Sequence, residues 1–193
     1  MSEQRIYERA LERLMHELDQ AICEDRAHAA IWDCHTSQGM SFFRIAFYAL
    51  SNDTVAHAIK ILDRHPQSAS FWYIFQQKEQ EIRAFCAAHS ISLTEIEAVS
   101  DALKNIRDRT HFHIDRRDVF DPEAVWRRAG LKHSRFTAVL ESLWKILDHF
   151  YTAESGQSFG MPDYTGSDVE PILRAVKEAE ILPIIFENDP QMA

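Results

Sequence analysis

The sequence predicts an all-α protein, an up-and-down bundle of helices, and three observations lead to this prediction. The chain has 193 residues, a length typical of one domain. Apolar residues recur three and four positions apart over most of it, the spacing of an amphipathic helix. It contains only 5 Gly and 6 Pro, too few for the turn at about every 8–12 residues that an all-β sandwich needs. The all-β class is therefore excluded.

Two long helices are expected first. One runs from about Ser2 to about Cys34, and the other from about Ser41 to Arg64. The second ends there because the residue before Pro66 is disfavoured in the α conformation. The apolar face of the first helix is expected to contain Ile6, Ala10, Leu14, Leu18, Ile22 and Ala29.

The middle of the chain predicts shorter helices. Residues 68–76 are rich in aromatic side chains, and at this density aromatic residues form core more often than a platform for stacked bases. A charged helix is expected at about 78–88. Ser92 and Glu95 have the spacing of a capping box, in which hydroxyl and carboxylate each accept a hydrogen bond from a free backbone N–H. They predict a helix that starts at this point.

The last third of the chain predicts two helices, a loop and a final helix. Asp121-Pro122-Glu123 is a typical helix start, Gly130 ends that helix, and Ser134 begins the next. Residues 1–151 are thus expected to form the bundle and 152–166 a polar loop. Residues 167–193 are expected to form an extra C-terminal helix and an apolar tail (Ile181–Phe186), packed on the same domain.

Charge, cysteine content and hydropathy restrict the partners. The net charge is −9, which disfavours nucleic acid as a partner of the chain as a whole. Residues 101–135 nevertheless carry nine Lys or Arg against six Asp or Glu, a local excess that can form a focused anion site. Three cysteines without Cys-x-x-Cys spacing indicate a reducing, cytoplasmic setting. The apolar runs are too short to span a membrane, so no membrane partner is expected.

The segment with the most chemically active side chains is 104–115, Lys-Asn-Ile-Arg-Asp-Arg-Thr-His-Phe-His-Ile-Asp, and it is the main candidate for a functional site. Arg107-Asp108, followed after four residues by His113, resembles the Arg-polar-x(3–5)-His signature of the HEPN superfamily of small helical proteins. Two other stretches, 41–64 and 68–72, resemble the abortive-infection AbiU-type branch of that superfamily. The similar segments cover about residues 40–150. Where Asn is common in the family, this chain has Asp108.

The resemblance implies a homodimer that cleaves RNA without a metal or other cofactor. His113 would transfer protons, because the reference pKa of His is about 6.5. Arg107 would bind phosphate oxygens and stabilise the charge that develops on them, and Asp108 would orient either residue. The products would be a 2′,3′-cyclic phosphate and a 5′-OH. The implied setting is phage defence or a toxin–antitoxin system with an antitoxin protein, and Arg109, His111 and Asp115 are secondary candidates.

Helix geometry sets a condition on this site. In a straight α-helix a six-residue step leaves Arg107 and His113 about 120° apart. Arg107 would share a face with His111 instead, four residues on. Arg107 and His113 therefore converge only if the helix loosens near Phe112, or if two chains face each other.

Two other functions fit the same segment. One is a non-catalytic helical dimer that binds nucleotide, RNA or a protein partner, with the charged residues forming a solvated helix end. The other is a metal-dependent hydrolase that uses His111, His113 and Asp115, with His133 the nearest residue to complete the ligand set. The metal site is disfavoured, because alternate residues share a face of a strand and not of a helix.

Overall fold

The fold is all-α, as predicted. A computed structural model describes residues 2–33, 41–111, 121 and 123–180, and among these residues every regular element is helical. In chain order they are α1 (Glu3–Asp33), α2 (Ser41–Ile61), α3 (Phe71–Gln77), α4 (Glu79–Ala88), α5 (Leu93–Ile106), the π-helical turn η1 (Arg107–His111), α6 (Glu123–Ala129), α7 (His133–Ser155) and α8 (Val169–Glu180).

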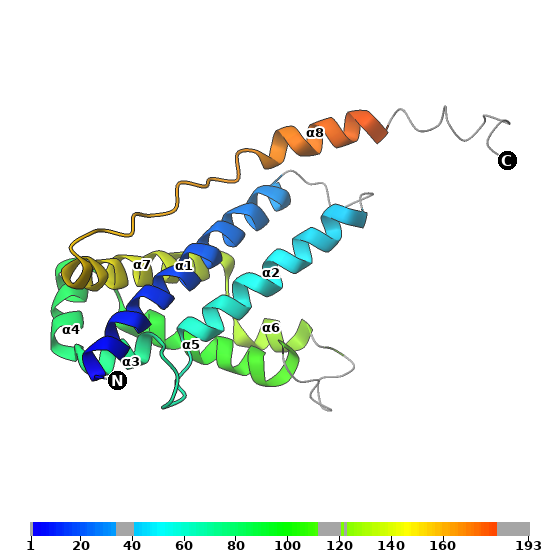
Figure 1. The fold of residues 1–193 in the computed structure, drawn as a ribbon. Coiled ribbons are helices and arrows are strands. Elements are labelled where there is room, and N and C mark those ends of the chain that lie inside the picture. The colour runs from blue at the N-terminus through cyan, green and yellow to red at the C-terminus, as the bar shows by residue number, and fades with distance from the viewer. Residues whose placement is uncertain (1, 34–40, 112–120, 122, 181–193) are drawn as a thin grey trace, which may run out of the picture.

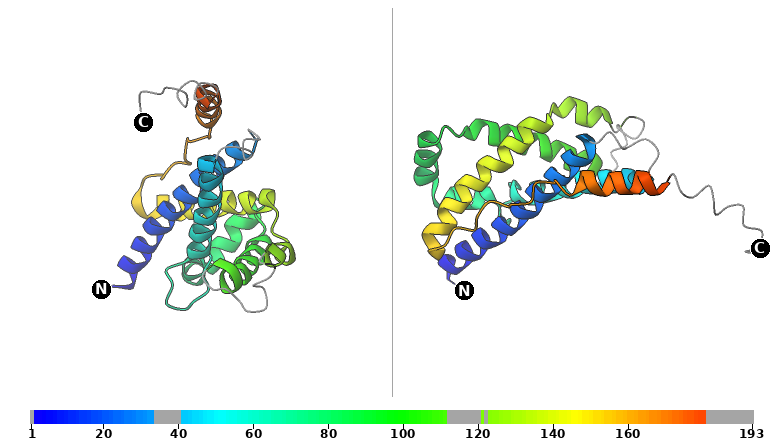
Figure 2. Two further views of the ribbon diagram at one scale, coloured as in Figure 1. Left: turned by 90° about the vertical axis from the view of Figure 1, so that its right-hand side faces the viewer. Right: turned by 90° about the horizontal axis from the view of Figure 1, so that it is seen from above.

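The long helices α1 and α2 form the frame of the bundle. They run side by side along most of their length, and α7 packs across α1, as the views in Figures 1 and 2 show together. Helices α3, α4 and α5 pack against the end of this frame where α1 starts and α2 ends (Figure 1). The C-terminal end of α2 therefore meets α5, and this junction positions the site described below.

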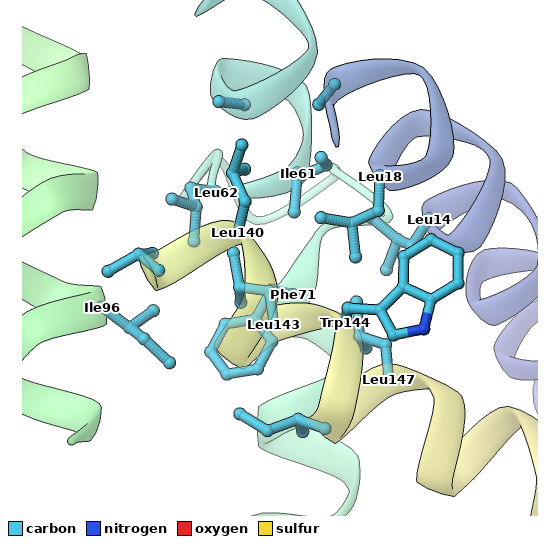
Figure 3. Packing of buried hydrophobic residues seen from close by; sticks show 14 of the residues in the cluster. Leu14, Leu18, Ile61, Leu62, Phe71, Ile96, Leu140, Leu143, Trp144 and Leu147 are labelled. Atoms are coloured by element: carbon cyan, nitrogen blue, oxygen red, sulfur yellow. The ribbon is translucent and has the colours of Figure 1, made fainter. Parts of the chain in front are cut away.

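The core lies where α1, α2, α3, α5 and α7 converge (Figure 3). Its members are fully buried apolar side chains three or four positions apart on each helix, as an amphipathic face requires. On α1 the expected face is confirmed at Ala10, Leu14, Leu18 and Ile22, which are buried. At the start of the helix Tyr7 is buried instead of Ile6, which is 38% exposed. Labelled in Figure 3 are Leu14, Leu18, Ile61, Leu62, Phe71, Ile96, Leu140, Leu143, Trp144 and Leu147.

Aromatic residues of α3 belong to this core. Phe71 is completely buried, and Trp72, Tyr73 and Phe75 pack partly buried against it. The Phe71 and Trp72 rings meet edge-on with their centroids 5.1 Å apart, a favourable geometry for aromatic pairs. The expectation that this group forms core is confirmed.

Helix α2 ends three residues earlier than expected, at Ile61. The carbonyl oxygen of Leu62 accepts hydrogen bonds from the Trp72 indole (3.1 Å) and the buried Ser100 hydroxyl (3.1 Å). These tertiary partners satisfy a carbonyl that a longer helix would have used, and the chain turns away. The Asp63 carboxylate then accepts the His65 backbone N–H at 3.3 Å, which forms the turn.

Other helix boundaries follow their caps. Ser92 caps α5 by accepting the Glu95 backbone N–H at 3.2 Å, so half of the expected capping box is present. The Glu95 carboxylate accepts a hydrogen bond from Arg135 of α7 instead. Asp121 caps α6 by accepting the Ala124 backbone N–H at 3.0 Å. Helix α7 begins at His133, one residue before Ser134.

The expected loop 152–166 is wrong at its start, because α7 continues to Ser155. The helix ends where Gly156 adopts φ of 74° and donates its N–H to the Thr152 carbonyl, a typical glycine cap. The irregular segment is thus 156–168. It lies along α1, where Arg26 donates hydrogen bonds to the carbonyls of Pro162 (2.7 Å) and Tyr164 (2.8 Å).

Helix α8 follows and contacts α1 (Figure 1). The apolar tail 181–186 lies outside the described residues. Among the helices described, none combines the length and the apolar composition needed to cross a bilayer.

Candidate functional site

Arg107 lies at the junction where α5 changes from α-helical to π-helical winding. Helix α5 ends at Ile106, and η1 covers Arg107 to His111. Wider π turns inside or at the end of α-helices frequently mark functional sites. The helix thus widens from Arg107 to His111, whereas Phe112, where loosening was considered, lies outside the described residues. Of the other candidates, His113 and Asp115 lie outside the described residues.

Two carboxylates hold the Arg107 guanidinium. Its Nε donates to Asp108 Oδ1 at 2.8 Å, and its Nη1 donates to Asp63 Oδ1 at 3.1 Å. The hydrogen bond to Asp108 is the largest influence and raises the pKa of Arg107, and the charge of Asp63 adds to it. The guanidinium is 30% exposed. Arg107 is thus a fixed, permanently charged group that remains accessible from solvent.

A pocket of about 370 Å³ lies beside Arg107, between the end of α2 and the last turns of α5. Its charged lining comprises three permanent cations, Arg64, Lys104 and Arg107, and one carboxylate, Asp63. Lys104 is exposed. On a chain with net charge −9, this pocket is a local cationic concavity, the kind of surface that concentrates anions.

At one side of the pocket the Arg64 side chain stacks on the Trp72 ring. The Arg64 guanidinium carbon lies 4.5 Å from the centroid of the Trp72 ring, which is cation–π geometry. Its Nη1 lies 3.7 Å from Asp101 Oδ1. Asp63 contacts Arg107, and the neighbouring Arg64 contacts Trp72. Residues of the three stretches quoted for the sequence resemblance, 41–64, 68–72 and the motif at 107, therefore lie close together at this end of α2.

A second, more open pocket of about 470 Å³ shares Arg107 and Asp63 with the first. Its other charged residues gather around the buried Glu17 carboxylate of α1, which is 8% exposed. Glu17 accepts hydrogen bonds from His57 Nδ1 at 2.6 Å and Lys60 Nζ at 3.1 Å. Its Oε1 also forms an ion pair with Arg13 Nη2 at 2.7 Å. This cluster joins α1 to the half of α2 that leads into Asp63.

The surroundings of Glu17 and Glu24 shift the pKa values of these two carboxyl groups in opposite directions. Burial alone would raise the pKa of Glu17, but the hydrogen bonds from His57 and Lys60 outweigh it and hold this pKa below its usual value. Burial raises the pKa of Glu24, whose Oε1 lies 3.7 Å from His57 Nε2 and whose Oε2 is buried without a hydrogen bond. Glu17 therefore keeps its charge and anchors the cations.

The sequence indicated only part of this site. Arg107 and Asp108 were expected, and their side chains do meet. Arg109 and His111 lie in η1. Asp63, Arg64 and Lys104 were not singled out as functional residues. Asp63 and Arg64 stand inside a stretch quoted for the resemblance, so that stretch was the available signal.

The structure gives no support to a metal centre in the part of the chain that it describes. No group of three or more His, Cys, Asp or Glu there is arranged to hold an ion. His133, considered as a completing ligand, instead lies 3.5 Å from the buried carboxylate of Asp25, and its ring is 5.9 Å from that of His28. Of the other three expected ligands, His111 lies in η1, and His113 and Asp115 lie outside the described residues.

Comparisons of the chain with protein-family models, with curated proteins and with solved structures found no match. The class that the fold and the site define is an all-α bundle with a cationic pocket at a helix junction. Its function is argued from that pocket.

Proposed function

We propose that this chain is a metal-independent endoribonuclease of the HEPN type, in which Arg107 binds the phosphodiester that is cut. The observation that carries the proposal is the position of Arg107, a held and accessible guanidinium beside a pocket lined by two further cations. A guanidinium recognises a phosphate through paired N–H groups and stabilises the charge that builds on it.

The reaction that fits needs one imidazole and one guanidinium. His113 takes the proton of the ribose 2′-OH, and the 2′-oxygen attacks phosphorus. The bond from phosphorus to the 5′-oxygen breaks, and that oxygen receives the proton that His113 took. The products are a 2′,3′-cyclic phosphate and a 5′-OH. Arg107 neutralises the pentacoordinate phosphorane between the two proton transfers.

The proposal includes the expected partners. The chain forms a homodimer in the cytoplasm, in which two Arg107–His113 motifs share one cleft. Its substrate is RNA, an antitoxin protein restrains it, and its setting is phage defence or a toxin–antitoxin system. The support is the sequence resemblance of three stretches whose residues lie close together through the contacts Asp63–Arg107 and Arg64–Trp72.

A second function is favoured by one observation. Asp63 and Asp108 both contact the Arg107 guanidinium, and two carboxylates on one cation weaken its attraction for phosphate. Binding without cleavage does not require a cation that stabilises a transition state. The weakened attraction of Arg107 for phosphate is therefore compatible with a non-catalytic helical dimer that binds nucleotide, RNA or a protein.

An RNA cleavage assay in EDTA separates these functions. The proposed nuclease cuts RNA in EDTA, and His113→Ala abolishes cutting while RNA binding persists. His89→Ala is the matched control, because His89 lies at the end of α4 and its side chain contacts Phe85 and the Phe85 carbonyl. Cutting that EDTA stops would contradict the proposal in favour of a metal-dependent hydrolase, and binding without cutting would favour the non-catalytic module.

A further inference from the structure

The two carboxylates on Arg107 differ in how firmly they are held. Asp63 is 25% exposed, follows directly on the anchored end of α2 and also accepts the His65 backbone N–H at 3.3 Å. Asp108 is 47% exposed and, within the described residues, hydrogen-bonds only to Arg107. Asp63 is therefore a fixed partner, whereas Asp108 can leave at little cost, since exposed ion pairs contribute about 0.2–1 kcal/mol.

They also contact different edges of the guanidinium. Asp63 takes Nη1, and Asp108 takes Nε. In any guanidinium the N–H of Nε and one N–H of Nη2 point the same way and form the edge that grips a carboxylate or phosphate with two parallel hydrogen bonds. Asp108 uses half of this edge. Among the described residues nothing is hydrogen-bonded to Nη2 of Arg107.

We propose that Asp63 is the positioning residue of Arg107, and that Asp108 occupies the place on the guanidinium that a phosphodiester of single-stranded nucleic acid takes on binding. The phosphate displaces Asp108 from Nε and gains Nη2 as its second donor, while Nη1 stays on Asp63. The inference rests on the proposed function for the identity of the ligand. It reverses the expectation that Asp108 is the orienting residue.

Two neighbouring pockets meet at Arg107. Arg107 lines both of them, and so does Asp63, whereas Asp108 lines neither. A strand that passes from one pocket to the other crosses the guanidinium, with Lys104 on one side and Lys60 on the other.

The test compares three variants that each remove one carboxylate. Asp108→Ala, Asp63→Ala and the control Glu97→Ala lose the same charge, and Glu97 is an exposed residue of α5 about 15 Å along the helix axis from Arg107. The probe is a fluorescein-labelled oligodeoxyuridine, read by fluorescence anisotropy at fixed ionic strength. It lacks the 2′-OH, so binding is measured without cleavage.

Removing the two carboxylates is expected to change the affinity for the oligonucleotide in opposite directions. Asp108→Ala tightens binding about two- to fivefold, the worth of an exposed ion pair. Asp63→Ala weakens binding about fivefold although it removes a negative charge, because Arg107 loses its orientation. Asp63→Asn keeps an oxygen acceptor and recovers most of the affinity. Thermal melting by circular dichroism confirms that each variant is folded, and Asp63→Asn supplies the comparison if Asp63→Ala is not.

Three results would overturn the inference: tighter binding by Asp63→Ala, weaker binding by Asp108→Ala, or changes in both that match Glu97→Ala. Cleavage of the corresponding RNA by the unaltered protein is measured separately in EDTA. Intact RNA together with the expected binding pattern defeats the proposed nuclease and leaves the division of roles standing. Cleaved RNA together with a different binding pattern supports the proposed nuclease and defeats the division of roles between Asp63 and Asp108.

Discussion

Replacing Glu17 by Gln is expected to lower the melting temperature by about 6–12 °C at pH 7. Glu17 is 8% exposed, accepts hydrogen bonds from His57 and Lys60, and forms an ion pair with Arg13. A hydrogen bond to a charged group contributes about 1.5–3 kcal/mol. Gln retains one acceptor and presents an N–H₂ to the donors on the other side, so the expected loss is about 3 kcal/mol. For a chain of this length 1 kcal/mol corresponds to about 2–4 °C.

The difference in melting temperature between the two proteins is expected to depend on pH. The pKa of Glu17 in the folded protein lies below its usual value, so the unfolded chain binds the proton first as the pH falls. The stabilisation is complete above the unfolded pKa of about 4.3 and is lost as the pH falls through the lower, folded pKa. The difference between the two proteins is therefore constant from pH 7 to about pH 5 and shrinks below about pH 4.

Melting curves by circular dichroism across this pH range measure the effect. Glu97→Gln on the surface of α5 is the control and should melt like the unaltered protein at every pH. A Glu17→Gln protein that melts within about 2 °C of the unaltered one at pH 7 would refute the reasoning. A difference that persists undiminished in acid would refute it as well.

Three further predictions concern the core, the C-terminal segment and the pocket. Phe71→Ala empties a fully buried position and should cost about 3–5 kcal/mol in urea unfolding; a loss under about 1 kcal/mol would contradict the packing described. Gly166→Ala would place a Cβ 2.9 Å from the Arg26 carbonyl oxygen at φ of +76°, so hydrogen exchange should quicken in 156–168 and stay unchanged in α7, and equal rates would count against that contact. Lys104→Ala should reduce the slope of RNA affinity against salt by about 0.7, and an unchanged slope would remove Lys104 from the RNA path.

Much of the fold could be predicted because its signals are local. Helical spacing of apolar residues depends only on the nearby sequence, and so do the caps at Ser92 and Asp121 and the stop at Gly130. Each of these leads to an element close to the expected bounds. The predicted α1 face is wrong at its first residue, since Ile6 and Tyr7 are both apolar and packing selects Tyr7.

The sequence-based predictions were wrong or incomplete where residues far apart in the sequence determine the structure. Helix α2 ends early because the carbonyl of Leu62 is bound by Trp72 and Ser100, and no local signal announces these partners. The same holds for the site. Arg107 and Asp108 are neighbours in sequence and were expected to act together, whereas Asp63 reaches Arg107 across 44 positions and is visible only once α2 and α5 are packed.

The central claim is that Arg107 and His113 act on one phosphodiester through attack by the ribose 2′-oxygen. The most direct measurement is mass spectrometry of the products from two matched RNA strands, one unmodified and one carrying 2′-O-methyl groups throughout. The account predicts 2′,3′-cyclic phosphate and 5′-OH ends from the first strand, in EDTA, and no cleavage of the second. Cleavage of the methylated strand, or products with 5′-phosphate ends, would contradict it.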